Sequence, residues 1–197
     1  MAGGIRHTGI AEGKPVRERR TLSQRQLTYE AVGMTLAGGA VSVPAGYRGY
    51  EKTVNIGNGV VRWEFASAAV LRWGVKTRSG FTVVADRPSD HDPRVVLDQR
   101  YWLTARVGPF HVREPIQVVA VVDEPDRKGF AYGTLSGHPV SGEEAFIVDR
   151  QRDDGVWLTI RSLTQPTEGA WRAVGPAVAL AQRCYRRRYL RALTGPN

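Results

Sequence analysis

Short apolar runs separated by polar turns follow residue 80, and this pattern predicts an antiparallel sheet. The runs recur about every ten to twelve residues, with turn sequences such as Arg-Asp-Asp-Gly at 152–155 between them. No helix-length segment interrupts the runs, which argues against a parallel sheet. The predicted strands are residues 81–85, 95–97, 101–107, 116–123, 129–135, 144–150 and 156–163. Earlier in the chain, residues 47–56 have strand-like aromatic and β-branched content, and residues 27–32 are a possible first strand.

Two longer segments have the residue spacing of helices. Residues 60–77 are apolar on so much of their surface that we expect a mostly buried helix, with Asn58 as its N-cap and Gly80 at its end. Residues 177–193 are expected to form a long terminal helix. At about 100° per residue, its apolar stripe consists of Val178, Ala181, Tyr185, Tyr189, Ala192 and Leu193, with Gln182 inside the stripe and the arginines elsewhere.

The densest run of unusual residues is YGTLSGHPVSGEEAF at 132–146. Its glycines permit backbone angles that other residues avoid, and Pro139 fixes one more angle. The run therefore predicts a tight, glycine-bent connection between two strands that carries His138, Glu143 and Glu144.

The same run, with the GVW strand and the terminal RRYLRAL, resembles the family catalogued as domain of unknown function 1990. The resemblance extends to VPAGYR at 43–48, to GNG at 57–59, and to the helix containing Leu71 and Trp73, and it covers roughly residues 27–193. It implies a helix-grip fold similar to that of START and birch-pollen-allergen proteins, rather than a particular activity. The chain departs from the family pattern at PIQVV (115–119) and LTQP (163–166), which puts any inherited site in doubt and would suit a specialised reaction.

Together these features predict one α+β domain at residues 27–197, in which a curved antiparallel sheet grips the long C-terminal helix. Such a sheet leaves room for a small-molecule cavity against the helix, and a solid core is the alternative. Residues 1–26, rich in glycine and arginine, are expected to be a flexible basic tail.

The charge lies mainly at the two ends of the chain. Of the net charge of +9, residues 1–26 supply six cationic residues and two acids, and residues 172–197 supply six arginines and no acid. Because the body is close to neutral, a nucleic-acid-binding surface is unlikely on this pattern. The arginines of the last helix are expected to be a solvated face. We also expect no transmembrane span, no secretory signal and, with Cys184 as the single cysteine, a cytoplasmic location, as a monomer or homodimer.

The motifs of nucleotide, dinucleotide and zinc sites are missing from the sequence, so no cofactor and no metal are expected. His138 with Glu143 and Glu144 is the one candidate acid–base group, because a nearby carboxylate raises the pKa of an imidazole and fixes its tautomer. The alternative is that Glu143 and His138 only tie a hairpin together.

A second candidate set is the lining of a cavity. Tyr189 is a candidate acid–base residue there, and the candidate substrate-binding residues are Tyr132, Thr134, Trp157, Gln182 and Tyr185. The sequence therefore favours a protein with a pocket for a small apolar or amphipathic ligand. With the family resemblance, this suggests a cofactor-independent cyclase, isomerase or lyase in bacterial secondary metabolism. The alternative is a non-catalytic binding module for a lipid-like ligand, or for an anionic partner at the basic ends.

Overall fold

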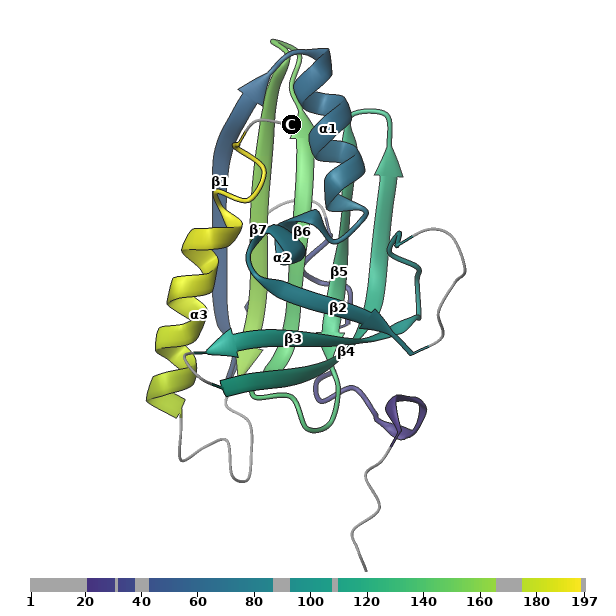
Figure 1. Ribbon diagram of the computed structural model, residues 1–197, viewed down its shortest axis with the longest axis vertical. Helices are drawn as coiled ribbons and strands as arrows, with labels where there is room; N and C mark the ends of the chain where they lie inside the picture. Colours follow the sequence, from purple (N-terminus) through teal and green to yellow (C-terminus); the bar gives the residue numbers. More distant parts are fainter. Residues whose placement is uncertain are drawn as a thin grey trace, which may run out of the picture.

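The computed structural model describes residues 21–30, 32–37, 43–86, 93–107, 110–165 and 175–195. These residues form one seven-stranded antiparallel sheet in the order β1-β7-β6-β5-β4-β3-β2 (Figure 1). The strands are β1 (Arg48–Asn58), β2 (Phe81–Ala85), β3 (Arg100–Val107), β4 (Phe110–Glu124), β5 (Arg127–Thr134), β6 (Ser141–Arg150) and β7 (Gly155–Gln165). Strands β2 to β7 are a meander of sequential neighbours, and β1 pairs with β7 at one edge. The expected antiparallel meander is confirmed.

The sheet is strongly curved. Strand β4 bends where its register with β5 shifts between Val118 and Ala120, and such a bulge turns a strand away from its neighbour. As a result β2, β3 and the start of β4 cross in front of β5, β6 and β7 in Figure 1. Helices α1 (Val60–Val70), α2 (Gly74–Arg78) and α3 (Gly175–Tyr189) lie on the inner side of this curve. The predicted α+β, helix-grip arrangement is therefore confirmed.

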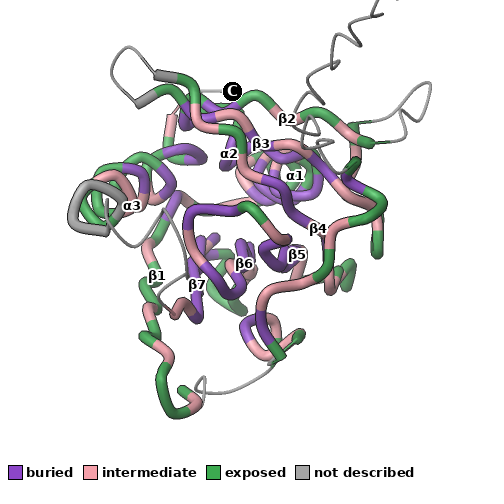
Figure 2. The backbone as a smooth tube through the Cα atoms, turned by 90° about the horizontal axis from the view of Figure 1, so that it is seen from below, coloured by how far each residue is buried: buried purple, intermediate pink, exposed green. Residues whose placement is uncertain are grey.

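Alternation along the strands separates an inner from an outer layer of side chains. On β6, Phe146 and Val148 face the helices and join the main core, whereas Ala145 and Ile147 face the other way and form a small outer cluster. Figure 2 shows the buried backbone gathered in the central strands and on the helix surfaces that face them. The sheet therefore has two covered faces, and the inner one carries most of the apolar burial.

The predicted helix at 60–77 is two helices, because the chain reverses at Trp73. Trp73 has a left-handed backbone (φ 61°) and is 2% exposed, with its ring against Tyr101 and Phe130. A Cβ on the next residue, Gly74, would lie 2.6 Å from the carbonyl oxygen of Ala69, so only glycine permits this close turn. Burial of the indole has overridden the helical pattern, and α2 consequently points Lys76 toward the sheet.

Three further sequence expectations were wrong. In the predicted strand at 27–32, the described residues form no more than an isolated bridge from Leu27 to Leu135, and Tyr29 bonds to the side chain of Glu143 on β6 instead of extending a ladder. Residues 95–97 are not a strand, since the Val95 amide bonds to the carbonyl of Leu71. The N-cap of α1 is Gly59 at φ 83°, and Asn58 ends β1.

The segment from residue 21 to residue 37 packs on the outer face of the sheet. Leu22 is 1% exposed and its carbonyl accepts a 2.7 Å bond from Arg100. Tyr29 lies so close over Gly133 that a Cβ there would sit 2.4 Å from the tyrosine oxygen. The last six residues of the expected 1–26 tail therefore belong to the folded part, and residues 1–20 lie outside the described residues. Among the described helices, none has the length and apolar composition needed to span a bilayer.

Candidate functional site

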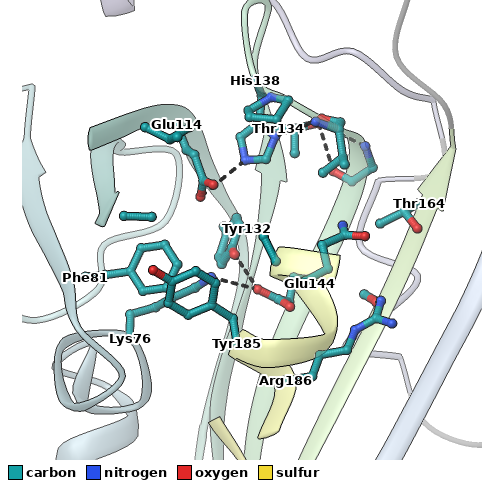
Figure 3. A pocket seen from close by; sticks show the side chains of 18 of the residues that line it. Lys76, Phe81, Glu114, Tyr132, Thr134, His138, Glu144, Thr164, Tyr185 and Arg186 are labelled. Atoms are coloured by element: carbon teal, nitrogen blue, oxygen red, sulfur yellow. Dashed lines mark hydrogen bonds and ion pairs between the residues drawn. The ribbon is translucent and has the colours of Figure 1, made fainter. Parts of the chain in front are cut away.

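A cavity of about 520 Å³ lies between the inner face of the sheet and α3 (Figure 3). Its wall is contributed by α2, by strands β2 to β7, by the β5–β6 connection and by α3. The volume is within the range of small-molecule sites. Much of the wall is apolar, for example Phe81, Val112 and Ala181, and a few ionisable groups project into it. The sequence was compatible with either a cavity or a solid core at this place, and the structure has a cavity.

Lys76 is the centre of a buried polar network in this cavity. It is 2% exposed, and its Nζ lies 2.9 Å from Glu144 Oε2 and 2.7 Å from the hydroxyl of Tyr189. The hydroxyl of Tyr132 also donates to Glu144. The Lys76 ammonium lies 4.5 to 5.5 Å from the ring centroids of Phe81, Tyr132, Phe146 and Tyr189. Rings at these distances stabilise a cation that burial would otherwise penalise.

Burial keeps the two tyrosines of this network in the phenol form. It is the main cause that raises the pKa of Tyr132 and of Tyr189 well above the usual range, and the negative charge of Glu144 raises both further. Both residues were predicted from the sequence as site residues, and the structure brings them together around Lys76. At neutral pH they act as hydrogen-bonding groups.

Glu114 and His138 form a second pair in the cavity. Burial raises the pKa of Glu114 to about 7, although Lys76 lowers it; the charge of Glu144 raises it further. Burial, and then Lys76, lower the pKa of His138 to about 3, so its imidazole is neutral at physiological pH. Its Nε2 lies 3.7 Å from Glu114 Oε2, beyond hydrogen-bonding distance, and has no hydrogen-bond partner among the described residues. We expected a carboxylate to raise the pKa of His138, and the structure has the opposite shift.

The backbone holds the His138 ring in place. Nδ1 lies 3.1 Å from the amide nitrogen of Val140 and 2.9 Å from its carbonyl oxygen, so Nδ1 is satisfied in either tautomer. Nε2 is therefore left for a group inside the cavity. A buried nitrogen without a partner carries a desolvation cost, which an incoming donor or acceptor relieves.

Glu143 borders the cavity, but its carboxylate bonds to the N-terminal segment and not to this pair. It is 1% exposed, and its carboxylate accepts bonds from the Tyr29 hydroxyl (2.7 Å), the Gly33 amide (2.7 Å), the Thr35 amide (2.9 Å) and the Thr35 hydroxyl. It does not pair with His138 as the sequence suggested, because successive residues of β6 point to opposite faces of the sheet. This geometry favours a structural role for Glu143, as an anchor for the N-terminal segment, and leaves Glu144 in the cavity.

Of the other residues predicted to line the cavity, three do so and one does not. Thr134, Gln182 and Tyr185 line the cavity. Trp157 does not, because Leu158 and Ile160 face inward on β7 and the tryptophan must then face outward. The hydroxyl of Thr134 accepts a 2.9 Å bond from the Gly142 amide and lies 2.6 Å from the hydroxyl of Thr28, so it closes the β5–β6 connection.

The model of the family described as Domain of unknown function (DUF1990) matches residues 28–192. The chain belongs to this family. It is also 31% identical over 175 residues to a UPF0548 protein of Deinococcus radiodurans, which covers 84% of this chain and 85% of that protein. The resemblance read from the sequence is therefore confirmed, and its expected extent of residues 27–193 is close to the match.

The fold of this chain is also similar to solved structures of low sequence identity. A hypothetical protein from Helicobacter pylori superimposes with a TM-score of 0.50 at 13% identity, over 75% of this chain and 85% of that one, which shows a shared fold alone. Ginseng major latex-like protein 151 from Panax ginseng gives a TM-score of 0.47 at 12% identity, over 76% of this chain and 99% of that one.

The charged cavity residues that were not found from the sequence are Lys76, Glu114 and Arg186. Lys76 depends on the chain reversal at Trp73. Glu114 was placed in a loop, because the predicted strand began at residue 116, whereas β4 begins at Phe110. Arg186 was assigned to the solvated face, although it lies one helical turn after Gln182, which belongs to the apolar stripe; that spacing was the available signal.

The Glu114–His138 pair predicts opposite pH dependences of stability in two single variants. Between about pH 4.5 and 7 the folded state keeps a proton on Glu114 that the unfolded state releases, so this carboxyl makes stability fall as pH rises. Between about pH 3 and 6.5 the unfolded state protonates His138 and the folded state does not, so the imidazole makes stability rise with pH.

Urea unfolding at several values between about pH 5 and 6.5 measures both effects. In Glu114→Gln the contribution of His138 remains, and stability should rise by about 1 kcal/mol for each unit by which pH increases. In His138→Gln the contribution of Glu114 remains, and stability should fall by a similar amount over the same change in pH. His111→Gln, an exposed site on β4, is the control and should follow the wild type. Equal slopes in the two variants would contradict the assigned shifts.

Proposed function

We propose that the protein binds a small amphipathic molecule in the cavity and transfers a proton on it with its own side chains. The observation that carries this proposal is the facing pair of Glu114 and His138. A carboxyl group whose pKa is raised to about 7 exists in both forms at neutral pH, which suits a group that accepts and then returns a proton. The partnerless Nε2 of His138, 3.7 Å from it, leaves a place for a ligand atom.

The proposed step is an isomerisation. The Glu114 carboxylate accepts a proton from a carbon next to a carbonyl group of the ligand. The electron pair of the broken C–H bond forms a C=C bond, and the carbonyl π pair moves to the oxygen. With its proton on Nε2, the neutral His138 donates a hydrogen bond to that oxygen. Glu114 then returns the proton to a different atom of the same molecule, so no co-reactant is consumed.

The Lys76 network supports this chemistry electrostatically. The buried ammonium lies beside Glu144 and Tyr189 and lowers the pKa of both Glu114 and His138. A fixed positive charge in a water-poor site stabilises negative charge that develops on a bound oxygen. A cyclase or lyase that starts with the same proton abstraction belongs to the same proposal. A place in bacterial secondary metabolism stays a prediction from the family resemblance.

A non-catalytic binding module is the second candidate. It is favoured by the apolar part of the wall, including Phe81, Val112 and Ala181, and by the complete pairing of Lys76 with Glu144 and Tyr189. A network satisfied without a ligand can serve stability alone. If the protein is a binding module, it holds the molecule in the cavity and releases it unchanged.

Native mass spectrometry of the purified full chain, followed by denaturation and identification of any released molecule, tests the binding role. The released molecule is then returned to ligand-free protein in D₂O. Under the proposal it gains deuterium at carbon faster than in buffer alone, because Glu114 exchanges its proton with solvent between turnovers. A molecule that binds tightly and gains no deuterium would support the non-catalytic module instead.

A further inference from the structure

Arg186 is a cation of the cavity wall that lacks a carboxylate partner. It is half-buried on α3, its Nη2 lies 3.0 Å from the hydroxyl of Ser162, and its guanidinium stacks 4.0 Å from the ring centroid of Tyr50. Within the described part of the chain, no acid lies within ion-pair distance of it. A guanidinium has five N–H donors, and these contacts leave several of them unused. The stack on Tyr50 fixes the plane of the group before any ligand arrives.

Arg186 differs from Lys76 and Arg161, the lysine and arginine that are buried among the described residues, since each of those two has a carboxylate partner. Lys76 has Glu144 at 2.9 Å, and Arg161, on the outer face of β7, has Glu51 at 3.2 Å. Arg186 therefore adds to the cavity wall a positive charge that no carboxylate of the described residues contacts within ion-pair distance. Partial burial of a charge without a counter-charge carries a desolvation cost, and an anionic ligand group would offset that cost.

The residues around Arg186 indicate the chemistry of the rest of the ligand. Gln182, Ser162 and Thr164 add an amide and two hydroxyls to the cavity wall, and Figure 3 shows Arg186 and Thr164 on the side of Glu144 away from Glu114. Phe81 and Val112 make another part of the wall apolar. We infer that the ligand is an amphipathic organic acid whose ionised carboxylate pairs with Arg186. This inference rests on the proposed function, because it concerns the ligand of the same cavity.

A single guanidinium without a carboxylate partner suits a monoanion. A guanidinium pairs a carboxylate through two parallel N–H bonds, whereas a doubly charged phosphate group would leave negative charge unmatched here. With the acid held by α3, the rest of the molecule extends along the apolar wall toward Glu114 and His138. The substrate class is therefore a carboxylic acid whose reacting carbonyl lies away from its carboxylate.

A matched pair of probes tests this assignment. Naphthylacetate and naphthylacetamide have nearly the same shape and differ in charge, and their dissociation constants are measured by calorimetry at about pH 6, where Glu114 is mostly protonated. We expect the wild type to bind the acid about 10- to 100-fold more tightly than the amide. Arg186→Gln should remove this preference with little change in amide binding. Arg186→Lys, which keeps the charge, should retain part of it.

Arg187→Gln is the matched control, because Arg187 is an exposed residue of the same helix and the change in net charge is identical. Equal losses of acid binding in Arg186→Gln and Arg187→Gln would overturn the inference, since a general surface charge would then explain the preference. Equal binding of acid and amide by the wild type would also overturn it but leave the cavity as a ligand site. Failure of the wild type to bind either probe would overturn the carboxylate site. The deuterium experiment tests the proposed proton transfer independently of these probes.

Discussion

Replacement of Glu143 by alanine is expected to lower the free energy of unfolding by about 3–5 kcal/mol, because several buried donors lose their acceptor at once. The carboxylate is 1% exposed and accepts bonds from the side chain of Tyr29 and from the backbone of Gly33 and Thr35. These donors cannot reach solvent without displacing the N-terminal segment from the sheet. The loss is measured by urea denaturation of the full chain.

Two further variants separate the anchoring role of Glu143 from a general effect of removing an acid. Glu64→Ala removes an exposed carboxylate from α1 and should change stability by less than about 0.5 kcal/mol. Glu143→Gln keeps the size of the side chain but cannot accept all of these bonds, so it should fall between the two. Unchanged stability in Glu143→Ala, with loss of the proton transfer, would return Glu143 to the acid–base role that the sequence suggested.

Replacement of Glu114 by glutamine is expected to slow deuterium incorporation into the bound molecule by about 10²- to 10⁴-fold, the usual contribution of a general base. The amide has nearly the same shape as the carboxyl and neither accepts nor returns a proton at neutral pH. Because the native carboxyl is already disfavoured in its charged form, the variant should fold at least as well as the wild type above about pH 7.

The control for this variant is Glu124→Gln at the exposed end of the same strand, β4, which should leave the exchange rate unchanged. Mass spectrometry of the molecule after incubation in D₂O gives the rates for both variants. An exchange rate in Glu114→Gln equal to that of the wild type would show that another group abstracts the proton.

The strands and the terminal helix could be predicted from the sequence because their signals are local. Alternation and turn residues fix β5, β6 and β7 to within a few residues, and the spacing of Tyr185 and Tyr189 identifies the inner face of α3. The inward position predicted for Trp157 was wrong, because the inward-facing Leu158 and Ile160 place the tryptophan on the outer face of β7. A shift of one residue along a strand moves a side chain to the other face of the sheet.

The candidate site could be predicted only in part, since its pairs come from distant elements. His138, Glu144, Tyr132 and Tyr189 were found from motif and periodicity. Their partners Lys76 and Glu114 were not, because the contact of Lys76 with Glu144 spans 68 residues and depends on the reversal at Trp73. The shifted pKa of Glu114 depends on burial, which no local pattern specifies.

The anchoring of the N-terminal segment by Glu143 has a consequence for synthesis of the chain. Tyr29 is made 114 residues before the carboxylate to which it donates. At translation rates of about 5–20 residues per second, the segment waits roughly 5–20 s for its acceptor, and longer for β6 to pair. During that interval Leu22 and Tyr29 have no sheet to cover. The first of the described residues to be made are thus among the last to reach their native contacts, and a chaperone that binds this segment would have time to do so.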